Sequence, residues 1–141
     1  MRFINKPILM NTLFNNYKSL VLQVPAAVTA TAVTTGVDIS AYGKDLEVDV
    51  LVGAVTGTSP TLSVAIQTSP DNSTFTTQST ISLVSGSANL SAQASVIVPP
   101  THRYVRLSYT AGGTTPSFTV AVPAKIRAIN GGSTLNSATP A

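Results

Sequence analysis

Apolar and polar positions alternate between His102 and Thr110. The alternation separates a set of core positions, Val105, Leu107 and Tyr109, from a set of outward positions, His102, Tyr104, Arg106 and Ser108. Gly112 and Gly113 follow, and the alternation resumes at residues 118–122. A period of two is typical of a strand with one buried face, and a glycine pair between two such runs is typical of a turn. This stretch therefore predicts an antiparallel hairpin.

The same period recurs along the rest of the chain. Further strands are predicted over residues 18–24, 46–52, 62–66, 74–84 and 90–98. Pro25 is expected to end the first of them, and residues 53–60, which contain glycine and proline, are predicted to form a loop. The sequence SPDN at 69–72 has proline and aspartate where a type I turn favours them. The register of residues 26–39 stays ambiguous, since their apolar positions follow no single phase.

Many short strands separated by Gly and Pro turns, with no convincing helix, are typical of an all-β fold. We expect either an antiparallel jelly roll or another two-sheet β-sandwich, and the strand pattern favours neither. The abundance of Thr and Val agrees with this class, because β-branched side chains suit a pleated, half-buried surface.

The chain divides into three parts by composition. Residues 18–129 form the predicted β-sandwich or jelly-roll domain, and residues 130–141 form a low-complexity C-terminal tail, expected to be flexible. Residues 1–17 form an N-terminal arm without a clean period. Its candidate contact residues are Phe3, Ile4, Leu9, Leu13 and Phe14. The arm is either a frayed terminus or a segment that becomes ordered on a partner, since disordered tails rarely carry so many large apolar groups.

Composition excludes several classes of function. The chain has no cysteine, so it has neither a disulfide framework nor a thiolate metal site. Its net charge is only +3, and the basic residues are scattered, so no basic stripe exists to bind a nucleic acid backbone. No apolar run reaches the length that spans a bilayer, so no membrane association is expected.

One acidic cluster in the sequence is a candidate for a metal site or a catalytic site. Asp45, Glu47 and Asp49 alternate with apolar residues, which places their carboxylates about 7 Å apart along one side of a strand. A straight strand cannot surround a calcium ion with six to eight oxygens, and glycoside hydrolysis needs carboxylates on both sides of a cleft. We interpret this acidic ladder as a solvated face, with ion pairing across a strand or subunit as the main alternative.

Other polar residues give no catalytic constellation. His102 is the only histidine, and its sequence neighbours supply no carboxylate to orient it, so it is expected to lie exposed in a turn. Arg103, Tyr104 and Arg106 would form either a small recognition patch or the cover of a strand edge. We therefore predict no catalytic residue, no metal site and no cofactor.

Four stretches carry a resemblance to a known family. They are AVTATAVTTGVDIS, DLEVDVLVGAV, TLSVAIQTSPDNSTF and VIVPPTHRYVRLSYTAGGTTPSFTVAV. Together they resemble the small capsid cement, or head decoration, proteins of tailed bacteriophages, which have a jelly-roll fold. The resemblance spans approximately residues 26–122, and its most specific parts are a Q-x-S-x-D pattern and an R-Y-V-R-L-x-Y pattern. The segments at both ends of the chain depart from the family.

The resemblance implies a structural function. Such a protein would sit as a homo-oligomer, dimer or trimer, on the outer surface of the virion capsid, bind the major capsid protein and stabilise the assembled shell. The N-terminal arm would then make the capsid or inter-subunit contact. The alternative from a different class is a β-sandwich that binds a glycan or a cell surface. The absence of tryptophan weighs against that alternative.

Overall fold

The computed structural model describes residues 17–83 and 90–128, which form strands and their connections. The strands are β1 (Tyr17–Val28), β2 (Ala32–Val33), β3 (Val37–Asp38), β4 (Tyr42–Ser69), β5 (Thr76–Leu83), β6 (Leu90–Ile97) and β7 (Tyr104–Ala128). Every pairing between these strands is antiparallel.

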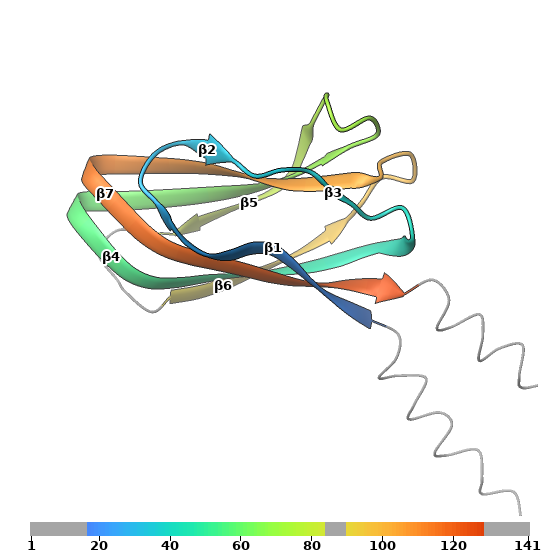
Figure 1. The fold of residues 1–141 in the computed structure, drawn as a ribbon, viewed down its shortest axis with the longest axis horizontal. Helices are drawn as coiled ribbons and strands as arrows, with labels where there is room; N and C mark the ends of the chain where they lie inside the picture. Colours follow the sequence, from blue (N-terminus) through green and yellow to red (C-terminus); the bar gives the residue numbers. More distant parts are fainter. Residues whose placement is uncertain (1–16, 84–89, 129–141) are drawn as a thin grey trace, which may run out of the picture.

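Two long strands organise the fold. β4 and β7 pair along almost their whole lengths, from Tyr42 opposite Ala128 to Ser69 opposite Tyr104. Near residues 57–60 and 112–116 their register shifts, and both strands bend together (Figure 1). We call this bend the corner. Because of the corner, each long strand contributes one half to each of two layers.

In each layer, one segment of β7 and one segment of β4 lie side by side in the middle, and shorter strands lie at the edges. One layer contains β1, residues 117–128 of β7, residues 42–56 of β4, and β6. The other contains β2 and β3, residues 104–114 of β7, residues 61–69 of β4, and β5. Two antiparallel sheets built from segments that repeatedly change layer define a jelly roll. The predicted all-β fold class is thus confirmed.

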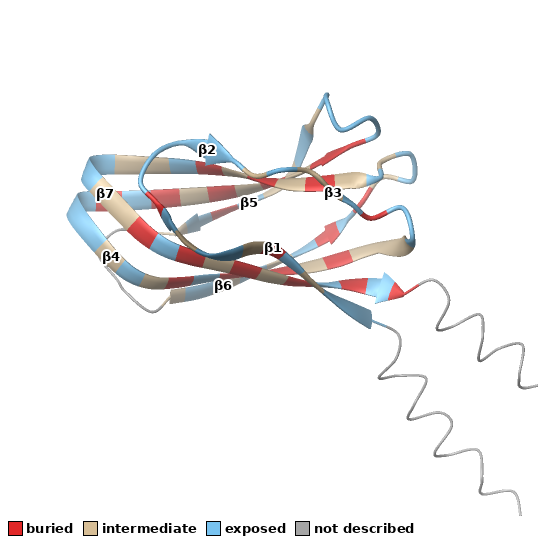
Figure 2. Ribbon diagram, in the orientation of Figure 1, coloured by how far each residue is buried: buried red, intermediate tan, exposed pale blue. Residues whose placement is uncertain are grey.

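The core lies between the layers and is filled by alternate side chains of the long strands (Figure 2). Val105 and Leu107 are fully buried and Tyr109 is 2% exposed, so the core positions predicted for this stretch are confirmed. In β7 the buried positions are odd-numbered before the corner and even-numbered after it, as at Phe118 and Val120. The corner therefore changes which face of the strand is inside.

The predicted hairpin and the predicted loop at 53–60 are both wrong. β7 continues through Gly113, and it stays paired with β4 around the corner, where Thr58 lies opposite Thr114. Gly57 and Gly113 have φ angles of 114° and 104°, a conformation that favours glycine. These glycines let two neighbouring strands fold together from one layer into the other (Figure 1), so they mark a shared corner where the sequence suggested a hairpin and a loop.

The expectation that Pro25 ends the first strand is also wrong. β1 continues to Val28, with register shifts on both sides of Gln23. Proline is tolerated here because β1 is the edge strand of its layer, and edge strands and bulges are where a missing N–H is least costly. The ambiguous segment 26–39 forms the end of β1 together with β2 and β3. The predicted turn at 69–72 is confirmed, since β4 ends at Ser69.

Candidate functional site

The predicted contact residues of the arm lie outside the described residues. They are Phe3, Ile4, Leu9, Leu13 and Phe14. The C-terminal tail, residues 130–141, lies outside them as well. The interpretation of both segments therefore stays a prediction, and the sites described below belong to the jelly-roll domain.

The acidic ladder lies on the outward face of β4. Asp45 forms an ion pair with Arg127 of β7, with 2.7 Å between Oδ2 and Nε, and both side chains are nearly half exposed. Glu47 lies opposite Lys125 in the register of the same strand pair. In the described part of the chain, no three His, Asp, Glu or Cys side chains are grouped so that they could hold a metal ion. Asp45 and Glu47 thus form a polar face with an ion pair across two strands, whereas Asp49 has one buried oxygen, Oδ1, without a hydrogen-bond partner within the residues that the structure describes.

His102 is half-buried, so the expectation that it lies exposed in a turn is wrong. Its Nδ1 lies 2.7 Å from Oγ1 of Thr68, a fully buried residue of β4. Lys44 Nζ donates a hydrogen bond of 2.6 Å to the His102 carbonyl oxygen. These contacts attach the segment before β7 to β4. They include no carboxylate that would orient the imidazole for proton transfer.

The arginines of the predicted recognition patch are engaged within the chain. Arg103 Nη2 donates to Asp38 Oδ2 at 2.8 Å, and this hydrogen bond, together with those from Ser40, lowers the pKa of Asp38 from 3.8 to about 2. The Arg106 guanidinium lies 3.9 Å from the centre of the Phe75 ring. Both arginines therefore stabilise connections between strands, which leaves fewer of their donors available for an external ligand.

A cavity opens beside β1 and β2. It has a volume of about 240 Å³. Most of its lining consists of small or apolar side chains, from Ala26, Ala27, Val28, Ala30, Ala32 and Val33. The register shifts around Gln23 displace β1 from regular pairing at this point. Because alanine side chains are short, they do not fill the space between β1 and the segment that leads into β2.

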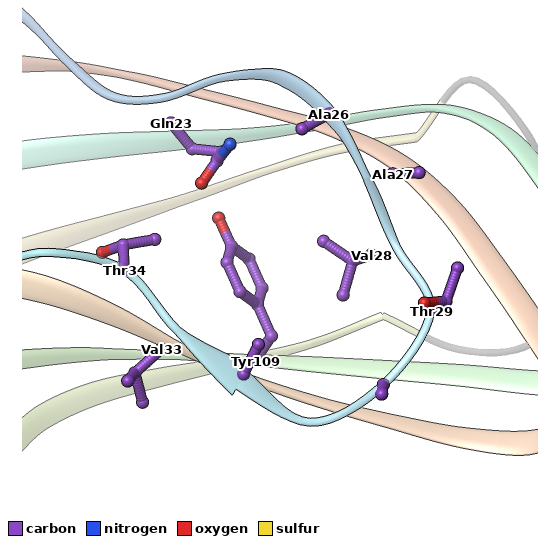
Figure 3. Close-up of a pocket in the computed structure, with 10 residues that line it drawn as sticks. Gln23, Ala26, Ala27, Val28, Thr29, Val33, Thr34 and Tyr109 are labelled. Atoms are coloured by element: carbon purple, nitrogen blue, oxygen red, sulfur yellow. The ribbon is translucent and has the colours of Figure 1, made fainter.

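Tyr109 gives the cavity its polar feature. Its ring belongs to the core, and its hydroxyl points toward the carboxamide of Gln23 (Figure 3). The hydroxyl is buried and has no hydrogen-bond partner among the described residues. Burial raises the pKa of Tyr109 from 10.0 to about 12. Gln23 Nε2 already donates to the Val24 carbonyl oxygen at 2.9 Å, and Thr34 Oγ1 accepts from the Leu107 N–H at 2.9 Å.

The alternation of residues 105–109 predicts that Tyr109 lies in the core, but it does not reveal the cavity. The available signal was the run of small residues from Ala26 to Ala32, in which Val28 is the largest side chain. The run alone predicts that the core is incompletely filled near these residues. It does not predict where the cavity lies, because Tyr109, on the other side of the cavity, is more than seventy positions away in sequence.

Comparison with known proteins supports the fold. No family model and no curated protein sequence matches the chain. The structure of PBSX exported protein XepA is similar, with a TM-score of 0.54 and 18% identity over 79% of this chain and 37% of that one. SPBc2 prophage-derived protein YomS has a TM-score of 0.50 and 12% identity, over 79% of this chain and 93% of YomS.

A third similar structure comes from a carbohydrate-active enzyme. It contains the CBM22-1-GH10 modules of xylanase 10B from Clostridium thermocellum with xylohexaose, with a TM-score of 0.51 and 14% identity. The match covers 81% of this chain and 26% of that one, so this chain spans about a quarter of the xylanase and little more than a third of XepA. At such identities these likenesses define the class: a jelly-roll β-sandwich, an architecture also found in phage-related proteins. Within the described residues, no helix has the length and apolar character to cross a membrane.

Proposed function

We propose that this protein is a non-enzymatic structural component of a tailed-phage virion, which binds the outer capsid surface and stabilises the assembled shell. The observation that carries the proposal is the position of the two motifs that resemble head decoration proteins. The motifs lie on neighbouring strands, with Gln67 opposite Arg106 and Ser69 opposite Tyr104. Arg106 Nε donates to Gln67 Oε1 at 2.8 Å. The residues that carry the resemblance therefore form one structural unit.

The fold comparisons add support of a general kind. The prophage-derived protein YomS matches over 93% of its length. An architecture shared with a prophage protein agrees with a phage origin for this jelly roll. Fold alone does not define function, so the sequence motifs carry the more specific argument.

The proposed mechanism is thermodynamic. A protein that binds only the assembled lattice stabilises that lattice by mass action. A symmetric homo-oligomer that touches several copies of the major capsid protein gains from effective concentration, so each single contact can be weak. In this proposal the apolar side chains of the arm make the capsid or inter-subunit contact.

Co-sedimentation with purified, expanded shells of the cognate phage tests the proposal. The full chain is expected to sediment with shells and to raise the temperature at which they break. A variant with Phe3, Leu13 and Phe14 changed to Ser is expected to lose binding, whereas a matched variant with Asn5, Asn11 and Asn15 changed to Ala keeps it. Absence of the full chain from the shell pellet would overturn the decoration role. Undiminished binding by the serine variant would reject only the role of the arm.

The alternative function, glycan binding, requires a different kind of surface. Stacking against sugars needs several exposed aromatic side chains. Among the large apolar side chains that are exposed in residues 17–83 and 90–128, Tyr17 is the single aromatic one. A glycan array with the same preparation is expected to show no specific binding. Specific glycan binding without shell association would replace the decoration role with this alternative.

A further inference from the structure

The volume of the cavity beside β1 and β2 matches that of a small molecule with one ring. Its volume of about 240 Å³ exceeds the roughly 150 Å³ of an apolar protein cavity that accommodates benzene. It falls short of the roughly 300 Å³ at which sites for drug-sized molecules begin. The volume therefore matches one small ring with a substituent.

The inner wall of the cavity offers one unused hydrogen-bonding group. The Tyr109 side chain is almost wholly buried, with 2% of the residue exposed, and its hydroxyl has no hydrogen-bond partner within residues 17–83 and 90–128. Figure 3 shows this hydroxyl directed into the space between Gln23 and Thr34. Asp49 Oδ1 is the other buried side-chain oxygen without a partner among the described residues, and it does not line the cavity. A buried hydroxyl left unpaired is unfavourable, so a ligand atom that pairs with it gains affinity.

The lining also restricts the charge and polarity of the ligand. None of the residues that line the cavity is charged, so a charged ligand would lose its hydration without compensation. Six of the ten lining residues are Ala or Val, so a sugar would find few side-chain partners for its hydroxyl groups. The side-chain hydrogen-bonding groups at the cavity are those of Tyr109, Gln23 and Thr34, with Thr29 exposed at its edge.

From these properties we infer that the cavity is a binding site for a small neutral molecule with an apolar ring and one hydroxyl or carbonyl group. The ring lies against the alanine and valine side chains, and the polar atom pairs with the Tyr109 hydroxyl. This site is independent of the capsid contact proposed above, since it uses none of the residues of the arm.

A series of cyclohexane derivatives tests the site, because they share a ring and differ in polar groups. The full chain, labelled with ¹⁵N, is titrated with cyclohexanol, myo-inositol or cyclohexanecarboxylate. Cyclohexanol is expected to shift the amide signals of Gln23, Ala32 and Thr34 in a saturable way. Neither the hexahydroxylated ring nor the charged ring is expected to do so. Equal binding of all three compounds, or no saturable shift with cyclohexanol, would overturn the inference.

Variants identify the role of the hydroxyl. Tyr109→Phe keeps the ring and is expected to weaken cyclohexanol binding roughly 2- to 10-fold, the value of one neutral hydrogen bond. Tyr104→Phe, on the outward face of the same strand, is the matched control and leaves binding unchanged. Ala26→Leu places a larger side chain into the cavity and is expected to abolish binding. Unchanged affinity in Tyr109→Phe and in Ala26→Leu would place the bound molecule elsewhere and reject this site.

Discussion

The two ends of the sandwich are held together in different ways (Figure 1). At the corner, β4 and β7 bend together, and the backbone itself sets the geometry. Gly57 and Gly113 adopt positive φ angles there, and so do Ser59 and Thr115, at 49° and 47°. Positive φ is unfavourable for residues with a Cβ atom, so the corner is a site of local backbone strain.

The opposite end consists of the connections that leave β3, β4 and β6, and side-chain hydrogen bonds hold it. Asp71 Oδ1 accepts backbone N–H groups of Ser73 and Thr74, each at 2.9 Å. These bonds, led by the one from Thr74, hold the pKa of Asp71 well below its ordinary value. The Asp38 and Arg103 pair and the Thr68 and His102 pair join neighbouring segments. We call this the loop end.

This difference indicates which amino-acid substitutions each end of the sandwich tolerates. At the corner a single added methyl group would meet backbone atoms, which move only if both strands move. At the loop end, removal of one side chain breaks only the hydrogen bonds of that side chain, while other pairs such as Thr68 and His102 keep theirs. The corner should therefore respond to substitution with large losses of stability, and the loop end with graded ones.

Gly113→Ala is expected to have the largest effect. A Cβ atom at Gly113 would lie 2.6 Å from the Ser59 carbonyl oxygen and 2.8 Å from that of Thr58, at a φ of 104°. Strain of this kind should lower the free energy of unfolding by about 2–3 kcal/mol, as measured by chemical denaturation.

Gly53→Ala is the matched control, on the same strand pair outside the corner. Its Cβ would meet Thr119 atoms only at 3.8 Å, an ordinary contact. The change should therefore alter stability by less than about 0.5 kcal/mol. Equal losses in the two variants would show that the corner is no more sensitive than the strands beside it.

The hydrogen bond between Thr68 and His102 gives the intermediate effect. Thr68→Val keeps the shape of a fully buried residue and removes the hydroxyl that contacts Nδ1. A double-mutant cycle with His102→Ala should give a coupling free energy of about 1 kcal/mol, typical of one net hydrogen bond. Additive losses, within about 0.3 kcal/mol, would mean that this contact does not hold the loop end together.

The same contrast explains how much of the fold could be predicted from the sequence. The inward positions of residues 105–109 were predicted correctly, because a period of two reports burial directly. The turn at 69–72 was also predicted, since proline and aspartate act locally there. The corner was missed because glycine and proline mark any sharp change in direction. Only the pairing of Thr58 with Thr114 distinguishes a corner shared by two strands from a hairpin turn within one sheet.

The candidate sites were less accessible to prediction. The outward acidic ladder was recognised from its spacing, while its partner Arg127 is 82 positions beyond Asp45 and could not be assigned from sequence. The cavity is a property of a gap between distant segments, and its hydroxyl comes from Tyr109, a residue whose pattern indicates only burial. Sequence periodicity shows which side faces inward, and it does not show where packing is incomplete.

Asp38→Asn tests the loop end by pH and should have the smallest effect, because both partners of the Asp38 and Arg103 pair are nearly half exposed. The pKa of Asp38 is about 2 in the folded chain, compared with an ordinary value of 3.8. A lowered pKa means that the carboxylate stabilises the fold above pH 3.8 and that this contribution disappears as the pH falls through 2. Thermal unfolding midpoints of wild type and variant should therefore differ slightly near pH 6 and converge near pH 2. Asp71 is present in both chains, so its own loss of stability in acid cancels in the comparison. A difference that stays constant between pH 2 and pH 6 would mean that Asp38 stabilises the fold through packing. The charge of its carboxylate would then contribute little to the stability of the loop end.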